Sequence, residues 1–398
     1  MARWLLGLSV AFILAATLTP GGTRLPDAWL ESCLRCGSFW LQDDISNLVL
    51  FLPLGAFARL GGWRVGRITV FAAVLSLSIE TAQYLLVPGR DSSLSDFLTN
   101  TTGALLGALL APAAGRALFA LGAVARRWLR LAAGGVLVFS VAASALMRPS
   151  AALTPVWVQV EPALEGAERA RLAVTRATID GAEVDVGRMR NTAGIREKLR
   201  RTDLVASVNL SQVELPRDGW ALFRMADPLA PAPVEIFSTA RGWVGRMAWR
   251  AEDFGLRSAD VLLPYAAATT APLTLTLERQ GAALSLSERS AAGERTSRTS
   301  LNATMAWIPF TPAVTDLSGN FQWLGLAWVL GVAALLGWWA SRSGGWGAFA
   351  EAAEMVAAAW LLPVAISGMA VPPWWAWVAA SGGGTLGAAC GITVRQRR

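Results

Sequence analysis

Long apolar runs restrict the fold of this sequence more than any other feature. Eight of them are long enough to cross about 30 Å of hydrocarbon as helices. Because backbone N–H and C=O groups in a bilayer need partners inside their own segment, such spans are helical. The sequence therefore predicts an α-helical polytopic membrane protein with about eight transmembrane helices, at residues 3–19, 46–61, 68–87, 98–120, 128–147, 321–340, 349–370 and 374–392.

The charge distribution agrees with a membrane protein and argues against a nucleic-acid partner. The chain is 54% hydrophobic and carries a net charge of +7. Residues 151–318 hold 19 basic and 19 acidic side chains, so the positive excess belongs to the apolar parts. A nucleic-acid interface would need a basic cluster on the soluble portion, where the charges balance.

The chemistry open to this chain is narrowed by the absence of histidine from its sequence. Histidine-based catalytic triads, zinc sites and proton relays are thereby excluded. The sequence also contains no phosphate-binding loop, dinucleotide fingerprint or HExxH motif. We expect no cofactor and no metal.

Arginines near the ends of the apolar runs predict how the chain crosses the membrane, because positive residues collect in cytoplasmic loops. With a cytoplasmic N-terminus, the short outside loops contain only Arg24, Arg35 and Arg90, and the C-terminus is also inside. The arginines that then lie on the cytoplasmic side are Arg3, Arg59, Arg64, Arg67, Arg116, Arg126, Arg127, Arg130, Arg342, Arg395, Arg397 and Arg398.

A soluble insert separates the fifth apolar run from the sixth. Residues 151–318 contain short alternating runs, such as "VWVQV" at 156–160 and "LTLTLE" at 273–278, broken by Gly, Pro and Asp. This pattern is typical of an antiparallel β-sandwich. The order of the runs over about 170–310 resembles a laminin-G or concanavalin-type jelly roll.

Three domains follow from this division. We predict a five-helix membrane domain at 1–147, an extracytoplasmic all-β sandwich at 151–318 and three C-terminal transmembrane helices at 321–392.

Polar residues interrupt the second, third and fourth apolar runs at steps of three or four residues, which places them on one face of each helix. In the predicted topology these stripes, with the loop residues Arg90 and Asp91, converge on the extracytoplasmic side. Ionisable groups at membrane depth are costly and mark functional sites, although helix-to-helix hydrogen bonding is an alternative reason for them. The stripes are Asp44, Asn47, Phe51 and Gly55; Glu80 and Gln83; and Asp96, Asn100, Gly103 and Gly107.

The segments "NLVLFLPLGAF", "SIETAQ" and "GRDSSLSDFLTNTTGALLG" resemble the VanZ-like family, which is named for a teicoplanin-resistance protein. The resemblance covers about residues 1–147 and implies a bacterial cell-envelope protein of the inner (cytoplasmic) membrane, with a role in glycopeptide resistance. It brings no agreed reaction. The matching positions are Asn47, Phe51, Pro53, Gly55, Glu80, Gln83, Arg90, Asp96, Asn100 and Gly103.

The expected ligand is a membrane lipid head group or a lipid-linked envelope precursor. Arg90, beside Asp91, would hold an anionic phosphate or carboxylate. The amides of Asn47, Gln83 and Asn100 would orient polar groups of the ligand. Whether a reaction occurs is left open; if one does, Glu80, Asp44 or Asp96 is the candidate acid or base.

Two cysteines three residues apart, Cys33 and Cys36, lie in the first outside loop. In an oxidising compartment they are candidates for a local disulfide, with free thiols as the alternative.

Two other functions compete with a lipid site. The helices could be a non-catalytic anchor for a sandwich at 151–318 that binds glycan or cell wall. A transporter would instead show paired repeats in both halves, and no second copy of the polar motifs follows residue 320.

Overall fold

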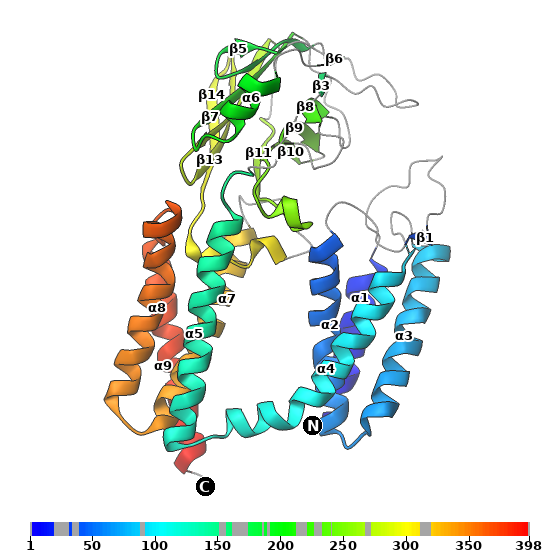
Figure 1. Ribbon diagram of the computed structural model, residues 1–398, viewed down its shortest axis with the longest axis vertical. Coiled ribbons are helices and arrows are strands. Elements are labelled where there is room, and N and C mark those ends of the chain that lie inside the picture. Colours follow the sequence, from blue (N-terminus) through cyan, green and yellow to red (C-terminus); the bar gives the residue numbers. More distant parts are fainter. Residues whose placement is uncertain are drawn as a thin grey trace. The chain divides into compact units, whose positions relative to one another are not determined.

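The computed structural model describes residues 2–19, 32–33, 40–87, 92–150, 157–160, 174–184, 187–188, 192–211, 221–226, 233–239, 241–266, 272–310 and 320–396. The chain divides into two compact units, Met1–Ala125 and Arg126–Arg398, which we call unit 1 and unit 2. Figure 1 shows the helices and strands of both.

Each predicted apolar run falls on one helix. The helices are α1 (Ala2–Leu18), α2 (Trp40–Leu60), α3 (Val65–Leu86), α4 (Leu94–Leu118), α5 (Gly122–Leu146), α7 (Asn320–Ser343), α8 (Trp346–Ser367) and α9 (Trp374–Gln396).

Five helices in the described part of the chain, α3, α4, α5, α7 and α8, are long and apolar enough to cross a membrane. The structure and the composition thus agree with a multi-pass membrane protein that carries a β domain. The count of eight spans and their orientation stay predictions.

Unit 1 is a bundle of α1 to α4 around a shared apolar core. Ile13 of α1, Leu54 of α2, Ile79 of α3 and Ala104 of α4 are all buried in one cluster, together with Phe51. In the turn that follows the C-terminal end of α2, the Arg67 guanidinium of α3 stacks on the Trp63 ring. The core therefore draws on every helix of the unit.

Helices α2 and α4 touch backbone to backbone, because glycines lie at each point of contact. A Cβ atom at Gly103 would overlap the carbonyl oxygen of Leu48, and one at Gly107 would overlap that of Leu52. The reverse contact places Gly55 of α2 against the Ala104 carbonyl. Small residues permit such close approach between membrane helices.

One substitution at this contact, compared with a control substitution elsewhere on α4, tests its importance. Gly103→Ala adds a methyl group where the Leu48 backbone leaves no room, so we expect unit 1 to lose about 1–3 kcal/mol of stability. The measurement is denaturant unfolding of the purified full-length protein in detergent. Gly115→Ala is the matched control on α4, since a Cβ there meets nothing within 4 Å and alanine favours helix by about 1 kcal/mol. Equal stability of the two variants would contradict the contact.

Unit 2 contains α5 together with α7, α8 and α9. Val136 of α5 packs on a cluster that includes Val329 of α7, Trp360 of α8 and Ala376 of α9. Helices α7 and α9 also meet at glycines, where a Cβ at Gly387 would overlap the Ala334 carbonyl. The compact units thus group the fifth predicted span with the C-terminal helices, while the predicted domain boundary after residue 147 stays a prediction.

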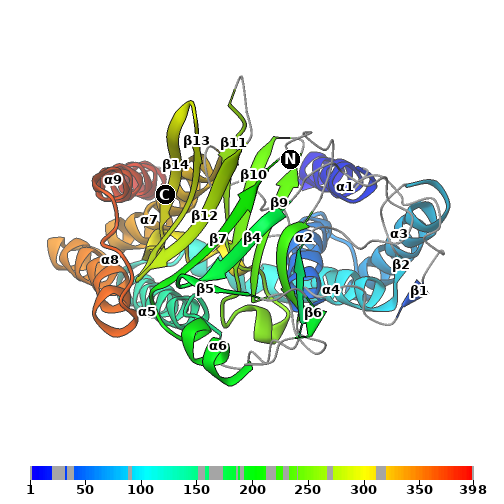
Figure 2. The same cartoon turned by 90° about the horizontal axis from the view of Figure 1, so that it is seen from above.

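In the part of the chain that the structure describes, the β domain of unit 2 consists of two six-stranded antiparallel sheets, in the orders β11-β10-β9-β8-β3-β6 and β14-β13-β12-β7-β4-β5. We call them sheet I and sheet II; Figure 2 shows their central strands from above. The predicted antiparallel β domain is confirmed, and the jelly-roll resemblance stays a prediction. The strands are β3 (Trp157–Val160), β4 (Val174–Ile179), β5 (Ala182–Glu183), β6 (Gly187–Arg188), β7 (Leu204–Leu210), β8 (Ala221–Ala226), β9 (Val234–Thr239), β10 (Gly242–Met247), β11 (Asp260–Pro264), β12 (Leu273–Gln280), β13 (Ala283–Ser290) and β14 (Gly293–Ser300).

The two sheets share one apolar core and one buried polar link. Leu275 and Leu277 of sheet II lie in the same cluster as Ile236 and Trp243 of sheet I. The Trp243 Nε1–H donates to Glu288 Oε2 at 2.8 Å across the core. Arg295 binds the same carboxylate oxygen at 3.0 Å, so the buried charge of Glu288 is compensated.

A helix that the sequence analysis did not predict, α6 (Thr192–Leu199), is attached to the β domain. Leu199 lies in the sandwich core. The buried Arg279 guanidinium donates to the carbonyl oxygens of Leu199 (3.0 Å) and Arg201 (2.7 Å) at its C-terminal end. Because the charged form of Arg279 is desolvated, burial lowers its pKa to about 10. These tertiary contacts stabilise a helix too short to be stable alone.

The connection between β10 and β11 joins the β domain to the end of α5. The Ala251 N–H donates to the Leu146 carbonyl at 2.9 Å, and the Arg250 N–H donates to the Arg148 carbonyl at 2.8 Å. In this connection Glu252 is buried. Burial raises the pKa of Glu252 to about 7, an effect that a hydrogen bond from Ser258 and the nearby Arg246 offset only in part.

The raised pKa of Glu252 predicts a pH-dependent stability. Between its ordinary value of 4.5 and its folded value of about 7, the folded state holds more of the proton than the unfolded chain does. Stability therefore falls as pH rises through that window, by about 3 kcal/mol in all. Glu252→Gln should flatten the dependence. The measurement is tryptophan-monitored unfolding of the full-length protein from pH 5 to pH 8, and a variant with the wild-type slope would show that another group is responsible.

Candidate functional site

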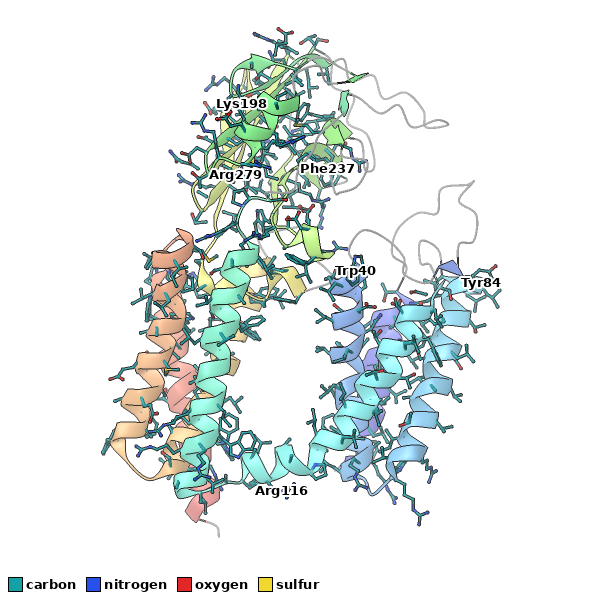
Figure 3. All side chains as sticks on the ribbon, in the orientation of Figure 1. Trp40, Tyr84, Arg116, Lys198, Phe237 and Arg279 are labelled. Carbon is teal, nitrogen blue, oxygen red and sulfur yellow. The ribbon has the colours of Figure 1, made fainter. Side chains whose placement is uncertain are left out.

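The polar stripes of unit 1 meet at one end of its helices. The start of α2, the end of α3 and the start of α4 lie there, as the positions of Trp40 and Tyr84 in Figure 3 show, while Arg116 lies toward the opposite end. The two-residue strand β1 (Ser32–Cys33) pairs in parallel with β2 (Ser92–Ser93), just before α4 begins.

Glu80 of α3 ties this helix to the chain that precedes α4. Its side chain is only 6% exposed, and its Oε2 atom accepts a hydrogen bond from the Ser93 backbone N–H at 2.9 Å. The Ser92 side chain also hydrogen-bonds to this carboxylate. The carboxylate is therefore partly satisfied by the β2 segment, and it fixes where α4 starts.

Asp96 of α4 receives a side-chain hydrogen bond from Asn47 of α2 and lies within electrostatic reach of Glu80, Asp43 and Asp44. We call these four carboxylates, Asp43, Asp44, Glu80 and Asp96, the acidic cluster. Three helices contribute to it. Carboxylate oxygens accept hydrogen bonds, so a ligand that donates hydrogen bonds complements the acidic cluster.

Two amide side chains continue the polar stripes on either side of Glu80. The Asn100 Nδ2 donates to Ser76 Oγ at 3.0 Å, one helical turn deeper than Glu80 and Asp96. The Gln83 Nε2 donates to the Thr17 carbonyl at 2.9 Å, which brings in the end of α1. The Oδ1 of Asn100 and the Oε1 of Gln83 are buried and accept no hydrogen bond within the described residues.

The spacing in the sequence explains these contacts only in part. Glu80 follows Ser76 by four residues and Asn100 follows Asp96 by four, so each pair shares a helix face. The bond between Asn47 and Asp96 requires α2 and α4 to run close together. The contact of Gly103 with the Leu48 backbone supplies that proximity.

The structure brings Asp44, Asn47, Glu80, Gln83, Asp96 and Asn100 to the same end of unit 1. Arg90, Asp91 and Cys36 lie outside the described residues, and of Cys33 only the backbone is described. The predicted anion contact and the predicted disulfide therefore stay predictions. In the described part of the chain, no group of three or more Cys, Asp or Glu side chains is arranged to hold a metal ion.

Sequence reasoning missed several polar partners at this end. Ser76 lies four residues before Glu80 and could have been found on the same stripe. Asp43 adjoins Asp44 and was not singled out. Ser93 and Thr17 act through backbone groups, for which the sequence carries no signal.

The Glu80 contact predicts different effects for two substitutions. Glu80→Leu leaves the buried Ser93 N–H without its acceptor, which should cost about 1–3 kcal/mol. Glu80→Gln keeps an acceptor oxygen and should cost less. Denaturant unfolding in detergent measures both, with the exposed Ser78→Ala on α3 as control. If Leu and Gln are tolerated equally, the Ser93 bond does not matter for stability.

Comparison with known proteins finds a family model that matches the helices around this site. Residues 11–118 match the family model described as VanZ/LLP1. The match confirms the predicted VanZ-like resemblance and extends from within α1 to the end of α4, which includes the acidic cluster. No curated protein and no solved structure matches the chain.

Proposed function

We propose that the VanZ-like region of this membrane protein binds the head group of an envelope lipid or lipid-linked precursor at the acidic cluster. The observation that carries the proposal is the convergence of Asn47, Glu80 and Asp96, from three helices, at one end of an apolar bundle. Polar groups placed at membrane depth are costly, so such convergence is typical of a binding site.

The chemistry of the described residues supports a ligand that carries N–H or O–H donors. Four carboxylates make up the acidic cluster, and the amide oxygens of Gln83 and Asn100 add acceptors that are otherwise unused within the described residues. An amine or hydroxyl of a head group would meet these acceptors. Arg90 is the proposed contact for the phosphate or carboxylate of the same ligand.

The charges at the two ends of unit 1 support a site in the outer leaflet. Arg59, Arg64 and Arg67 lie around the turn between α2 and α3. Arg116 lies near the end of α4, and Figure 3 draws it away from Trp40 and Tyr84. Since arginine collects on the cytoplasmic side of membrane proteins, the acidic cluster would face outside. This proposal includes the predicted N-in orientation in the inner membrane.

A role in glycopeptide resistance is the physiological part of the proposal. The VanZ/LLP1 match supports it, and a protein that binds an envelope precursor outside the membrane would alter what teicoplanin meets there. Glu80, Asp96 and Asp44 are the candidate acids or bases if binding leads to a reaction.

Growth of a host strain on a teicoplanin gradient tests the proposal. We expect the full-length protein to raise the tolerated concentration. Glu80→Gln and Asp96→Asn, expressed to the same level, should return it to that of the host alone, because each replaces one carboxyl group of the acidic cluster by an amide at nearly constant volume.

A matched control and a binding measurement separate the two parts of this proposal. Glu351→Gln removes a carboxylate of α8 that pairs with Arg130, in unit 2, and should keep full protection. Mass spectrometry of lipids that copurify with the protein should detect an envelope lipid with wild type and much less of it with Asp96→Asn. Protection that survives both cluster variants would overturn the site. Equal lipid content would overturn the ligand class.

A further inference from the structure

The outward face of sheet II presents hydroxyl groups in a regular array. Along β12, Leu273, Leu275 and Leu277 point into the core and are buried, whereas Thr274 and Thr276 alternate with them and are partly exposed. The neighbouring strand β13 alternates in the same way. One face of this sheet therefore forms the core and the other is open to solvent within the described residues.

One line of this array crosses five neighbouring strands in register. Ser207 pairs with Thr178 and with Thr276, and Ser287 pairs with Thr276 and with Thr296. We call Thr178, Ser207, Thr276, Ser287 and Thr296 the hydroxyl row. Figure 2 shows β14, β13, β12, β7 and β4 side by side. Strands lie about 4.8 Å apart, so the row repeats a hydroxyl at that interval.

The row is held in place by its own hydrogen bonds. Ser207 Oγ lies 3.2 Å from Thr276 Oγ1, and Ser287 Oγ lies 3.0 Å from Thr296 Oγ1. A hydroxyl both donates and accepts, with two lone pairs. Each pair therefore still has hydrogen-bonding capacity toward a ligand after its internal bond is made.

The lines on either side of the row carry charges of both signs. On one side Arg289 pairs with Glu294 at 2.9 Å. On the same side Arg176 pairs at 3.6 Å with Glu183 of β5, which continues the line of the row beyond Thr178. On the other side Ser285 lies between Glu278 and Arg298 in the register of the strands. Positive and negative charges thus balance across the face. A strongly charged polymer would meet no net opposite charge, whereas a neutral polyhydroxylated chain would find complementary groups.

Threonine is also common at exposed strand positions because its branched side chain fits a β-strand. This preference explains a threonine at a single position. It does not require serine and threonine at all five positions that β4, β7, β12, β13 and β14 contribute to one line. We propose that the outward face of sheet II binds a neutral glycan strand that lies along the hydroxyl row, across the β-strands. This site is separate from the acidic cluster and does not rest on the function proposed for it.

Titration of the full-length protein in detergent with a neutral chitin oligosaccharide tests the inference. The variant Ser207→Ala/Thr276→Val/Ser287→Ala removes the three central hydroxyls at nearly constant shape. We expect at least about a tenfold weaker affinity, since three hydrogen bonds to the ligand are lost. Thr202→Val, at an exposed position next to β7, is the control and should bind as wild type does.

A second variant guards against a change in folding. Thr276→Lys places a long cation in the middle of the row without altering the core face, and it should also abolish binding. Unfolding curves of all variants must match that of wild type. Undiminished binding by the triple variant, binding of polyphosphate but not of chitin oligosaccharide, or no binding by wild type would each overturn the inference. So would self-association through this face in the absence of glycan.

Discussion

Backbone contact between α2 and α4 is the interaction on which unit 1 depends. At Gly103 and Gly107 the opposing helix is so close that a methyl group would overlap a carbonyl oxygen. Dispersion and close packing, rather than the hydrophobic effect, drive such association inside a bilayer. The same contact sets the distance from Asn47 to Asp96 and thereby allows their hydrogen bond. Any residue larger than glycine at these positions would separate the polar stripes.

The polar end of unit 1 contains hydrogen bonds between its own elements and acceptor atoms that these bonds leave unused. Glu80 uses one carboxylate oxygen to position Ser93, and Gln83 uses its amide to hold the end of α1. Helix-to-helix hydrogen bonding, the simpler explanation of buried polar residues, is thus part of what they do. Those bonds leave some acceptor atoms unused, including Asn100 Oδ1, which has no partner among the described residues. This surplus of acceptors is what a donor-bearing ligand would use.

Unit 2 stabilises its β domain by different means. The sheets are joined by apolar burial and by the Trp243 to Glu288 hydrogen bond, and backbone bonds link the β10–β11 connection to the end of α5. The buried Glu252 at that junction lowers stability in its charged form. Sheet II differs between its two faces, with leucines inside and hydroxyls outside, so the same strands form a core and offer a surface.

The sequence by itself determined the membrane helices, the antiparallel β domain, the VanZ-like region and the stripes that carry Glu80, Asp96 and Asn100, because hydropathy and periodicity are local properties. The tertiary structure alone decided the rest. Ser93 and Thr17 join the site through backbone atoms, which residue identity does not encode. Helix α6 is stabilised by Arg279, distant in sequence, which binds the carbonyl of its last residue, Leu199, and that of Arg201 just beyond it. The hydroxyl row depends on the register between strands. Pairing between separate strands sets that register, so the sequence of one strand does not contain it.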